Sequence, residues 1–116
     1  MKDLPLVSVI IPAYKTSWFE TALASACAQT YANLEIIVCD DSDGAVICAI
    51  VERYAGSQQV PIHYQRNQQP LHEMRNTVEC IRLARGFYIK FLHDDDVLAP
   101  DCVARLVATM EADPHI

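Results

Sequence analysis

Hydrophobic positions along the chain alternate between short apolar runs and longer stretches in which apolar residues recur at helical spacing. Short runs rich in Val and Ile are typical of buried strands, and the longer spacing is typical of helices with one apolar face. The sequence therefore predicts four strands, at residues 7–14, 34–40, 60–65 and 87–93. It predicts four helices, one following each strand: from Ser17 to about Thr30, from the turn at 41–44 to Gly56, from about Leu71 to Arg85, and from Pro100 onward.

Local signals define the ends and inner faces of these helices. Ser17 and Glu20 have the spacing of a capping box at the start of the first helix. Gly56 and Gly86 are predicted to stop the second and third helices. The residues expected to face the core are Met74, Val78, Ile81 and Ala84 in the third helix, and Val103, Leu106, Val107 and Met110 in the last.

Strands that alternate with helices predict a mostly parallel sheet covered on both faces. We therefore expect an α/β fold with three αβα layers. The 116 residues contain no linker or repeat, so we expect a single domain over 1–116.

Composition narrows the class of protein. The net charge of −6 argues against a broad nucleic-acid footprint. The five cysteines are odd in number and lack CxxC spacing, which supports neither a zinc site nor a disulfide framework. No apolar run reaches the roughly 18 residues of a membrane span. We expect a cytoplasmic protein, which could also associate with the inner face of the membrane.

Polar and aromatic residues follow three of the predicted strands. In open parallel sheets, ligands bind outside the carboxyl ends of the strands. We call this edge of the sheet the rim. The residues expected at the rim are Pro12, Ala13 and Tyr14 after the first strand, Asp40 and Asp41 after the second, and His93, Asp94, Asp95 and Asp96 after the fourth.

The run Asp94-Asp95-Asp96 is the strongest single signal for chemistry. Three adjacent carboxylates repel one another, so water or a cation must compensate them. Mg²⁺ typically takes one or two carboxylates and completes its shell with substrate phosphates. The alternative is that these residues merely cap the following helix, which Asp96 could do alone.

Other rim residues each have two interpretations. Asp40 and Asp41 could contact a base or a ribose, or could form an Asx turn. Tyr14 could stack on a base or could be a residue at the edge of the core. Arg75 could pair with a diphosphate or could be a solvated surface residue.

Several common nucleotide and metal motifs are absent. The sequence has no GxGxxG after the first strand and no GxxxxGK[ST]. The segment DDSDG is too short for an EF-hand loop. A response-regulator receiver would carry an acidic pair after the first strand, where this chain has Pro12 and Ala13.

Four segments together resemble the family 2 glycosyltransferases of the GT-A fold. They are VSVIIPAY, QTYANLEIIVCDD, the pair Arg75-Asn76, and GFYIKFLHDDDVLAPD. The resemblance runs from about Leu6 to Asp113, and the four motifs stand in the family's order. Two departures are His93, where the commoner pattern has an aspartate, and Gln69-Pro70, where a glycine is usual.

The resemblance implies a nucleotide-sugar donor, with UDP foremost among the nucleotides, and a divalent Mn²⁺ or Mg²⁺. Asp95 would be the principal metal ligand, supported by Asp94 and Asp96, and His93 would not be one. The residues implied for the donor are Pro12, Ala13 and Tyr14 around the base, Asp41 on the base, and Asp94 on the ribose. Arg75 remains a further candidate for the donor, through a pairing with the diphosphate.

We therefore expect the donor-binding half of an inverting glycosyltransferase. The alternatives are a non-catalytic nucleotide-binding or interaction module, and a nucleotidyltransferase-like domain, for which Lys15 without following glycines is a poor match. The general base and acceptor site of the family follow the aspartate cluster by many residues. We accordingly expect a truncated chain that transfers no sugar efficiently and tends to form a homodimer; its acceptor, a saccharide or lipid, is left open.

Overall fold

The computed structural model describes residues 4–57, 60–113 and 115–116. The longest helix has 12 residues, and no helix in these ranges is both long and apolar enough to cross a membrane. The elements are, in chain order, β1 (Val7–Ala13), α1 (Phe19–Cys27), β2 (Leu34–Asp40), α2 (Val46–Ala55), β3 (Ile62–Arg66), α3 (His72–Leu83), β4 (Tyr88–Phe91) and α4 (Cys102–Ala112).

The strands form one sheet in the order β3-β2-β1-β4, and every pair is parallel. In the two central strands nearly every residue is buried, which explains their continuous apolar sequence. Because all strands run the same way, their carboxyl ends meet at one edge of the sheet. The predicted α/β class is confirmed.

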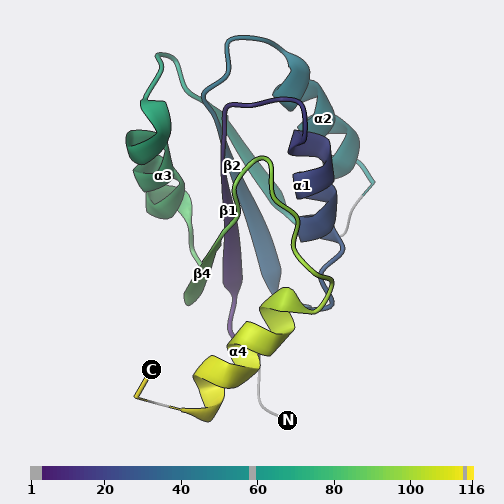
Figure 1. Ribbon diagram of the computed structural model, residues 1–116, viewed down its shortest axis with the longest axis vertical. Helices are drawn as coiled ribbons and strands as arrows, with labels where there is room; N and C mark the ends of the chain where they lie inside the picture. Colours follow the sequence, from purple (N-terminus) through teal and green to yellow (C-terminus); the bar gives the residue numbers. More distant parts are fainter. Residues whose placement is uncertain (1–3, 58–59, 114) are drawn as a thin grey trace.

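Helices cover both faces of the sheet (Figure 1). Val7, Val9 and Ile11 of β1 belong to the larger core, which includes buried residues of α1, α2 and α4. Ile10 points the other way, into a smaller core with Cys80 of α3. This alternation along one strand gives the predicted three layers.

The predicted capping box at α1 does not form. Trp18 is the N-cap residue and no side chain caps the helix. Glu20 instead pairs with Arg53 of α2 at 2.9 Å and accepts a hydrogen bond from Tyr54. The helix also starts two residues later and ends three residues earlier than predicted.

The predicted inner face of α3 is wrong for Met74, Val78 and Ile81, whereas Ala84 packs against the smaller core as expected. Met74, Val78 and Ile81 are 79%, 59% and 46% exposed, whereas Asn76 and Cys80 are the buried positions of the helix. The amide of Asn76 donates to the Cys39 carbonyl at 3.0 Å, so a polar residue takes the place that periodicity assigned to an apolar one. The exposed apolar side chains are compatible with the expected homodimer, which stays a prediction.

Two glycines have different roles. Gly56 caps α2, as predicted. Gly86 does not stop α3, whose C-cap is Ala84. A Cβ atom at Gly86 would lie 2.6 Å from the backbone nitrogen of Ser8, so close approach of the chain to β1 requires glycine there.

The remaining boundaries differ from prediction by a few residues. The third strand lies at Ile62–Arg66 and the fourth at Tyr88–Phe91, each shorter than predicted. In α4 the buried positions are Val103 and Val107, while Leu106 is 47% exposed.

Candidate functional site

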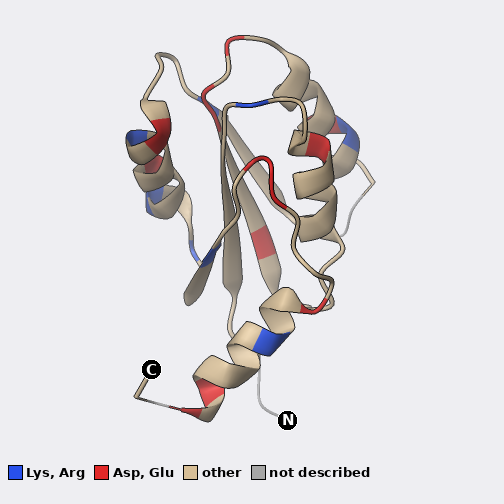
Figure 2. Ribbon diagram, in the orientation of Figure 1, with Lys and Arg blue, Asp and Glu red and all other residues tan. Residues whose placement is uncertain are grey.

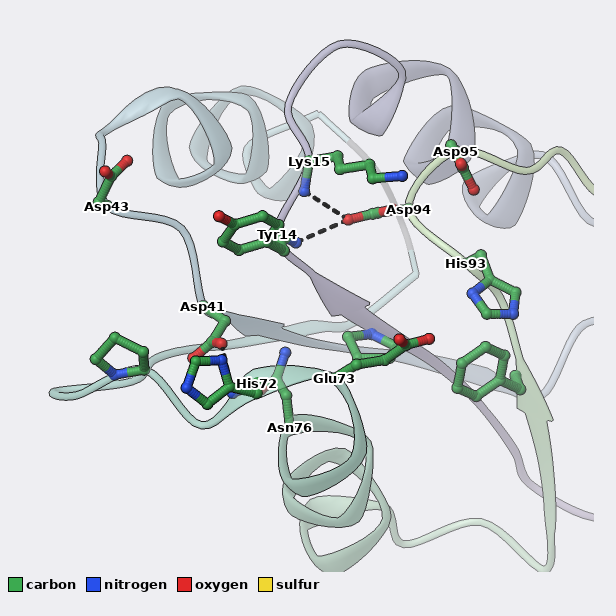
Figure 3. Close-up of a pocket in the computed structure, with 13 residues that line it drawn as sticks. Tyr14, Lys15, Asp41, Asp43, His72, Glu73, Asn76, His93, Asp94 and Asp95 are labelled. Atoms are coloured by element: carbon green, nitrogen blue, oxygen red, sulfur yellow. Dashed lines mark hydrogen bonds between the residues drawn. The ribbon is translucent and has the colours of Figure 1, made fainter.

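The carboxyl ends of β1, β2 and β4 meet the start of α3 around a pocket of about 570 Å³ (Figure 3). Acidic segments of the loops after β2 and β4 lie at this end of the sheet, and the loop after β1 carries a basic segment (Figure 2). The lining residues are Pro12, Tyr14, Lys15, Asp41, Asp43, Pro70, His72, Glu73, Asn76, Phe91, His93, Asp94 and Asp95. The structure thus brings together most of the rim that the sequence predicts.

Asp94 ties the β4 end to the loop that follows β1. One of its carboxylate oxygens accepts hydrogen bonds from the backbone N–H groups of Tyr14 and Lys15, both at 2.7 Å (Figure 3). Because a single oxygen makes both contacts, the other carboxylate oxygen of Asp94 is available to a ligand. Asp94 therefore shapes the pocket as well as lining it.

The other two aspartates of the run diverge. Asp95 lines the pocket with an exposed side chain, whereas Asp96 is exposed and is not among the lining residues. Within the described ranges, no three His, Cys, Asp or Glu side chains are grouped so that they could hold a metal ion.

Asp41 joins β2 to the start of α3. It is 8% exposed and accepts hydrogen bonds from the Asn67 amide at 2.9 Å and from the backbone N–H groups of Leu71 and His72 at 2.8 and 2.9 Å. Burial acts to raise the pKa of Asp41, but these hydrogen bonds outweigh it and hold the pKa below its ordinary value. Asp41 is therefore an ionised carboxylate on the pocket wall.

The start of α3 is conformationally unusual. His72 has φ 66°, the one positive value at a non-glycine residue in the part of the chain that the structure describes. An L-residue in this left-handed region is strained, and such strain persists only where surrounding contacts hold it. The contact that holds it is the hydrogen bond from its N–H to Asp41. This conformation brings His72 and Glu73 onto the pocket wall.

Asp40 has a structural role. It is fully buried, and its carboxylate accepts hydrogen bonds from the backbone N–H and hydroxyl of Ser42 and from the Tyr64 hydroxyl. The first of these is an Asx turn, the alternative weighed for this position. Burial and the contact with Asp40 raise the pKa of Tyr64.

The remaining predicted donor residues lie in different surroundings. Pro12 lines the pocket, and Tyr14 lines it with a side chain that is 67% exposed rather than packed at the core edge. Ala13 is fully buried, and its carbonyl accepts the Asp41 N–H. Arg75 is exposed on α3 and is not among the residues that line the pocket, which favours its interpretation as a solvated surface residue.

Several lining residues were not predicted as site residues. Lys15 and Asp43 follow strand ends by two or three residues, and Glu73 and Asn76 stand in the first turns of α3. Their position in the segments that follow strand ends could have indicated them, because the loops and helix starts at this edge of the sheet line the same crevice.

The family model for glycosyl transferase family 2 matches residues 8–116, and the chain belongs to this family. A chondroitin synthase of Escherichia coli is 40% identical over 105 residues, which are 89% of this chain and 15% of the relative. A β-1,3-glucosyltransferase of E. coli, named for UDP-Glc as its donor, is 33% identical over 114 residues, covering 95% of this chain and 43% of its own. The chain thus spans less than half the length of these relatives.

Solved structures share the fold. A mannosyltransferase from Pyrobaculum calidifontis, solved with GDP-Man and Mn²⁺, superposes with a TM-score of 0.86 at 24% sequence identity. The superposed region is 97% of this chain and 34% of the mannosyltransferase chain. TarS of S. aureus, solved with UDP, superposes with a TM-score of 0.83 at 20% sequence identity, over 92% of this chain and 32% of the TarS chain. These likenesses establish the GT-A fold.

Proposed function

We propose that the pocket binds the nucleoside diphosphate part of a sugar donor, as the donor-binding part of an inverting glycosyltransferase. The observation that carries this proposal is the meeting of Asp94 and Asp95 with Tyr14 and Asp41 around one pocket, from the ends of three strands. Family membership and the nucleotide complexes of the structural neighbours support it.

The base would bind between Tyr14 and Asp41. The exposed phenol ring of Tyr14 offers a stacking surface. Asp41 is ionised, and an ionised carboxylate is a strong acceptor for the imide or amide N–H of a uracil or guanine base. This arrangement favours a UDP- or GDP-linked donor.

The donor set fits a hard divalent cation. Asp94 and Asp95 offer carboxylate oxygens, which Mg²⁺ and Mn²⁺ prefer, and the ligand's phosphates would complete the shell. Asp95 would be the principal holder and Asp94 the second; Asp96, which does not line the pocket, would support them only through its nearby charge. When bound, such a cation supplies Lewis-acid stabilisation of the charge that develops on the leaving diphosphate.

We propose further that sugar transfer needs residues beyond these 116. An inverting transferase requires a carboxylate that deprotonates the acceptor hydroxyl. The greater length of the relatives supports an acceptor site and general base outside this chain. The isolated chain should then bind donor without turnover; robust acceptor glycosylation by it would overturn this and direct attention to Asp43, Glu73 and Asp96.

Calorimetric titration of UDP and GDP, with Mn²⁺ and with EDTA, tests the donor-binding proposal. The chain should bind at least one of them in a metal-dependent way, and Asp95→Asn should weaken that affinity by more than about tenfold. Asp113→Asn is the matched control, because it removes the same charge at the C-cap of α4, outside the pocket. Unchanged metal-dependent affinity in Asp95→Asn would refute the metal assignment, and no nucleotide binding at all would refute the proposed function.

A further inference from the structure

The charges that line the pocket are strongly unbalanced. Five carboxylates line it, and Lys15 is its one Lys or Arg residue among those described. A diphosphate brings further negative charge into this acidic environment, and like charges at close range repel strongly where solvent is partly excluded. One divalent cation offsets part of that repulsion, and a positively charged side chain beside the diphosphate would offset more of it.

Lys15 is held where it can supply this charge. Its backbone N–H donates to Asp94 at 2.7 Å, which fixes the start of its side chain beside the aspartate cluster. Figure 3 shows the side chain extending from the loop after β1 toward the end of the pocket lined by Asp94 and Asp95. Within the described residues its ammonium group has no ion-pair partner, so no contact has to be broken when a ligand binds.

The neighbouring arginines are less suited to this role. Arg75 is exposed and lies outside the pocket lining. The Arg66 guanidinium donates to the carbonyls of Gly44 and Ser42 at 2.5 and 3.0 Å, so it holds the loop after β2 in place. We propose that Lys15 binds the donor's diphosphate through its ammonium group, an inference that rests on the proposed function.

The expected consequence is a selective loss of diphosphate affinity. A charge-assisted hydrogen bond from an ammonium to a phosphate oxygen is among the stronger polar contacts, so its removal should weaken UDP binding about tenfold to a hundredfold. UMP should lose less and uridine should lose nothing, because the contact depends on the phosphates. The loss should shrink as salt rises, since the side chain is solvent-accessible.

Calorimetric titrations of UDP, UMP and uridine in the presence of Mn²⁺ test the inference with three variants of the 116-residue chain. Lys15→Gln removes the charge and Lys15→Arg keeps it. Arg105→Gln is the matched control, because it removes an exposed positive charge from α4, outside the pocket. We expect the graded loss in Lys15→Gln, near-normal UDP affinity in Lys15→Arg, and unchanged affinity in Arg105→Gln.

The outcomes separate this inference from the proposed function. Normal UDP affinity in Lys15→Gln overturns the role of Lys15 while leaving donor binding intact. Equal losses for UDP and uridine, or a larger loss in Arg105→Gln, overturn it as well. Absence of nucleotide binding in the unsubstituted chain overturns both proposals together.

Discussion

Replacing Asp41 with alanine removes the buried acceptor that joins β2 to α3. Three hydrogen bonds of 2.8 to 2.9 Å end on its carboxylate, from Asn67, Leu71 and His72. A hydrogen bond contributes about 1 kcal/mol net, and more when one partner is charged. The expected cost of Asp41→Ala is therefore about 3 kcal/mol, which for a domain of this size lowers Tm by roughly 10–15 °C.

Urea denaturation measures this cost directly. Asp41→Asn keeps one acceptor oxygen and the side-chain volume, so it should lose about half as much as the alanine variant. Asp43→Ala is the matched control, because that carboxylate is exposed in the adjacent loop and accepts no hydrogen bond within the described residues. A loss in Asp41→Ala below about 1 kcal/mol would refute the argument that this network holds the start of α3.

The same network predicts a pH dependence. The pKa of Asp41 is lowered on folding, so its contribution to stability is fully present above its unfolded-state pKa of about 4 and is lost as pH falls through the lower folded value. The acid-induced loss of stability should thus be smaller in Asp41→Asn than in the unsubstituted chain. An identical acid profile in both would contradict the lowered pKa.

Binding separates the structural role of Asp41 from a role in base recognition. Asp41→Ala should weaken UDP binding more than it weakens binding of pyrophosphate, since pyrophosphate has no base. Equal losses for the two ligands would mean that Asp41 only positions the loop and helix.

Two further substitutions test particular contacts. Gly86→Ala would bring a Cβ atom to 2.6 Å from the backbone nitrogen of Ser8, so we expect its free energy of unfolding to fall by about 2 kcal/mol or more. Gly44→Ala is the control, because its Cβ would lie in open space and its stability should hardly change in the same unfolding assay. Equal effects of the two substitutions would contradict the close approach at Gly86. His93→Asn should keep most of the metal-dependent UDP affinity, because hard cations prefer oxygen ligands and the His93 ring packs edge-on against Phe91. A loss of affinity as large as that of Asp95→Asn would identify His93 as a metal ligand.

The strands and the rim could be predicted because their signals are local. The second strand has the predicted bounds, Leu34–Asp40, since a fully buried parallel strand needs an unbroken apolar run. The order of strands and helices then directs Asp41 and Asp94 to one edge of the sheet, whatever the details of the loops.

The orientation of α3 could not be predicted in the same way. Met74, Val78 and Ile81 have helical spacing, but the face of α3 that is buried is the one that carries Asn76. The amide of Asn76 donates a hydrogen bond to the Cys39 carbonyl, 37 residues earlier in the chain. A hydrophobic pattern carries no information about such a distant polar partner. The unformed capping box has the same cause, since Glu20 finds Arg53 in another helix.

The position of Lys15 and the conformation of His72 also depend on tertiary contacts. Asp94 holds the backbone of Lys15, and Asp41 holds the backbone of His72. Both contacts join segments at least 30 residues apart in the chain. The sequence predicts that the two carboxylates bind a substrate, but it does not indicate that each also holds a neighbouring loop in place.

The central claim is that a nucleoside diphosphate and a divalent cation bind together at the ends of β1, β2 and β4. Amide NMR spectra of the chain with UDP test it, because paramagnetic Mn²⁺ broadens the signals of nearby residues and diamagnetic Mg²⁺ does not. With Mn²⁺ present, we predict strong broadening at Tyr14, Lys15, Asp94 and Asp95, with little effect at the far end of α4. Strongest broadening along α4, or none that depends on UDP, would contradict the account.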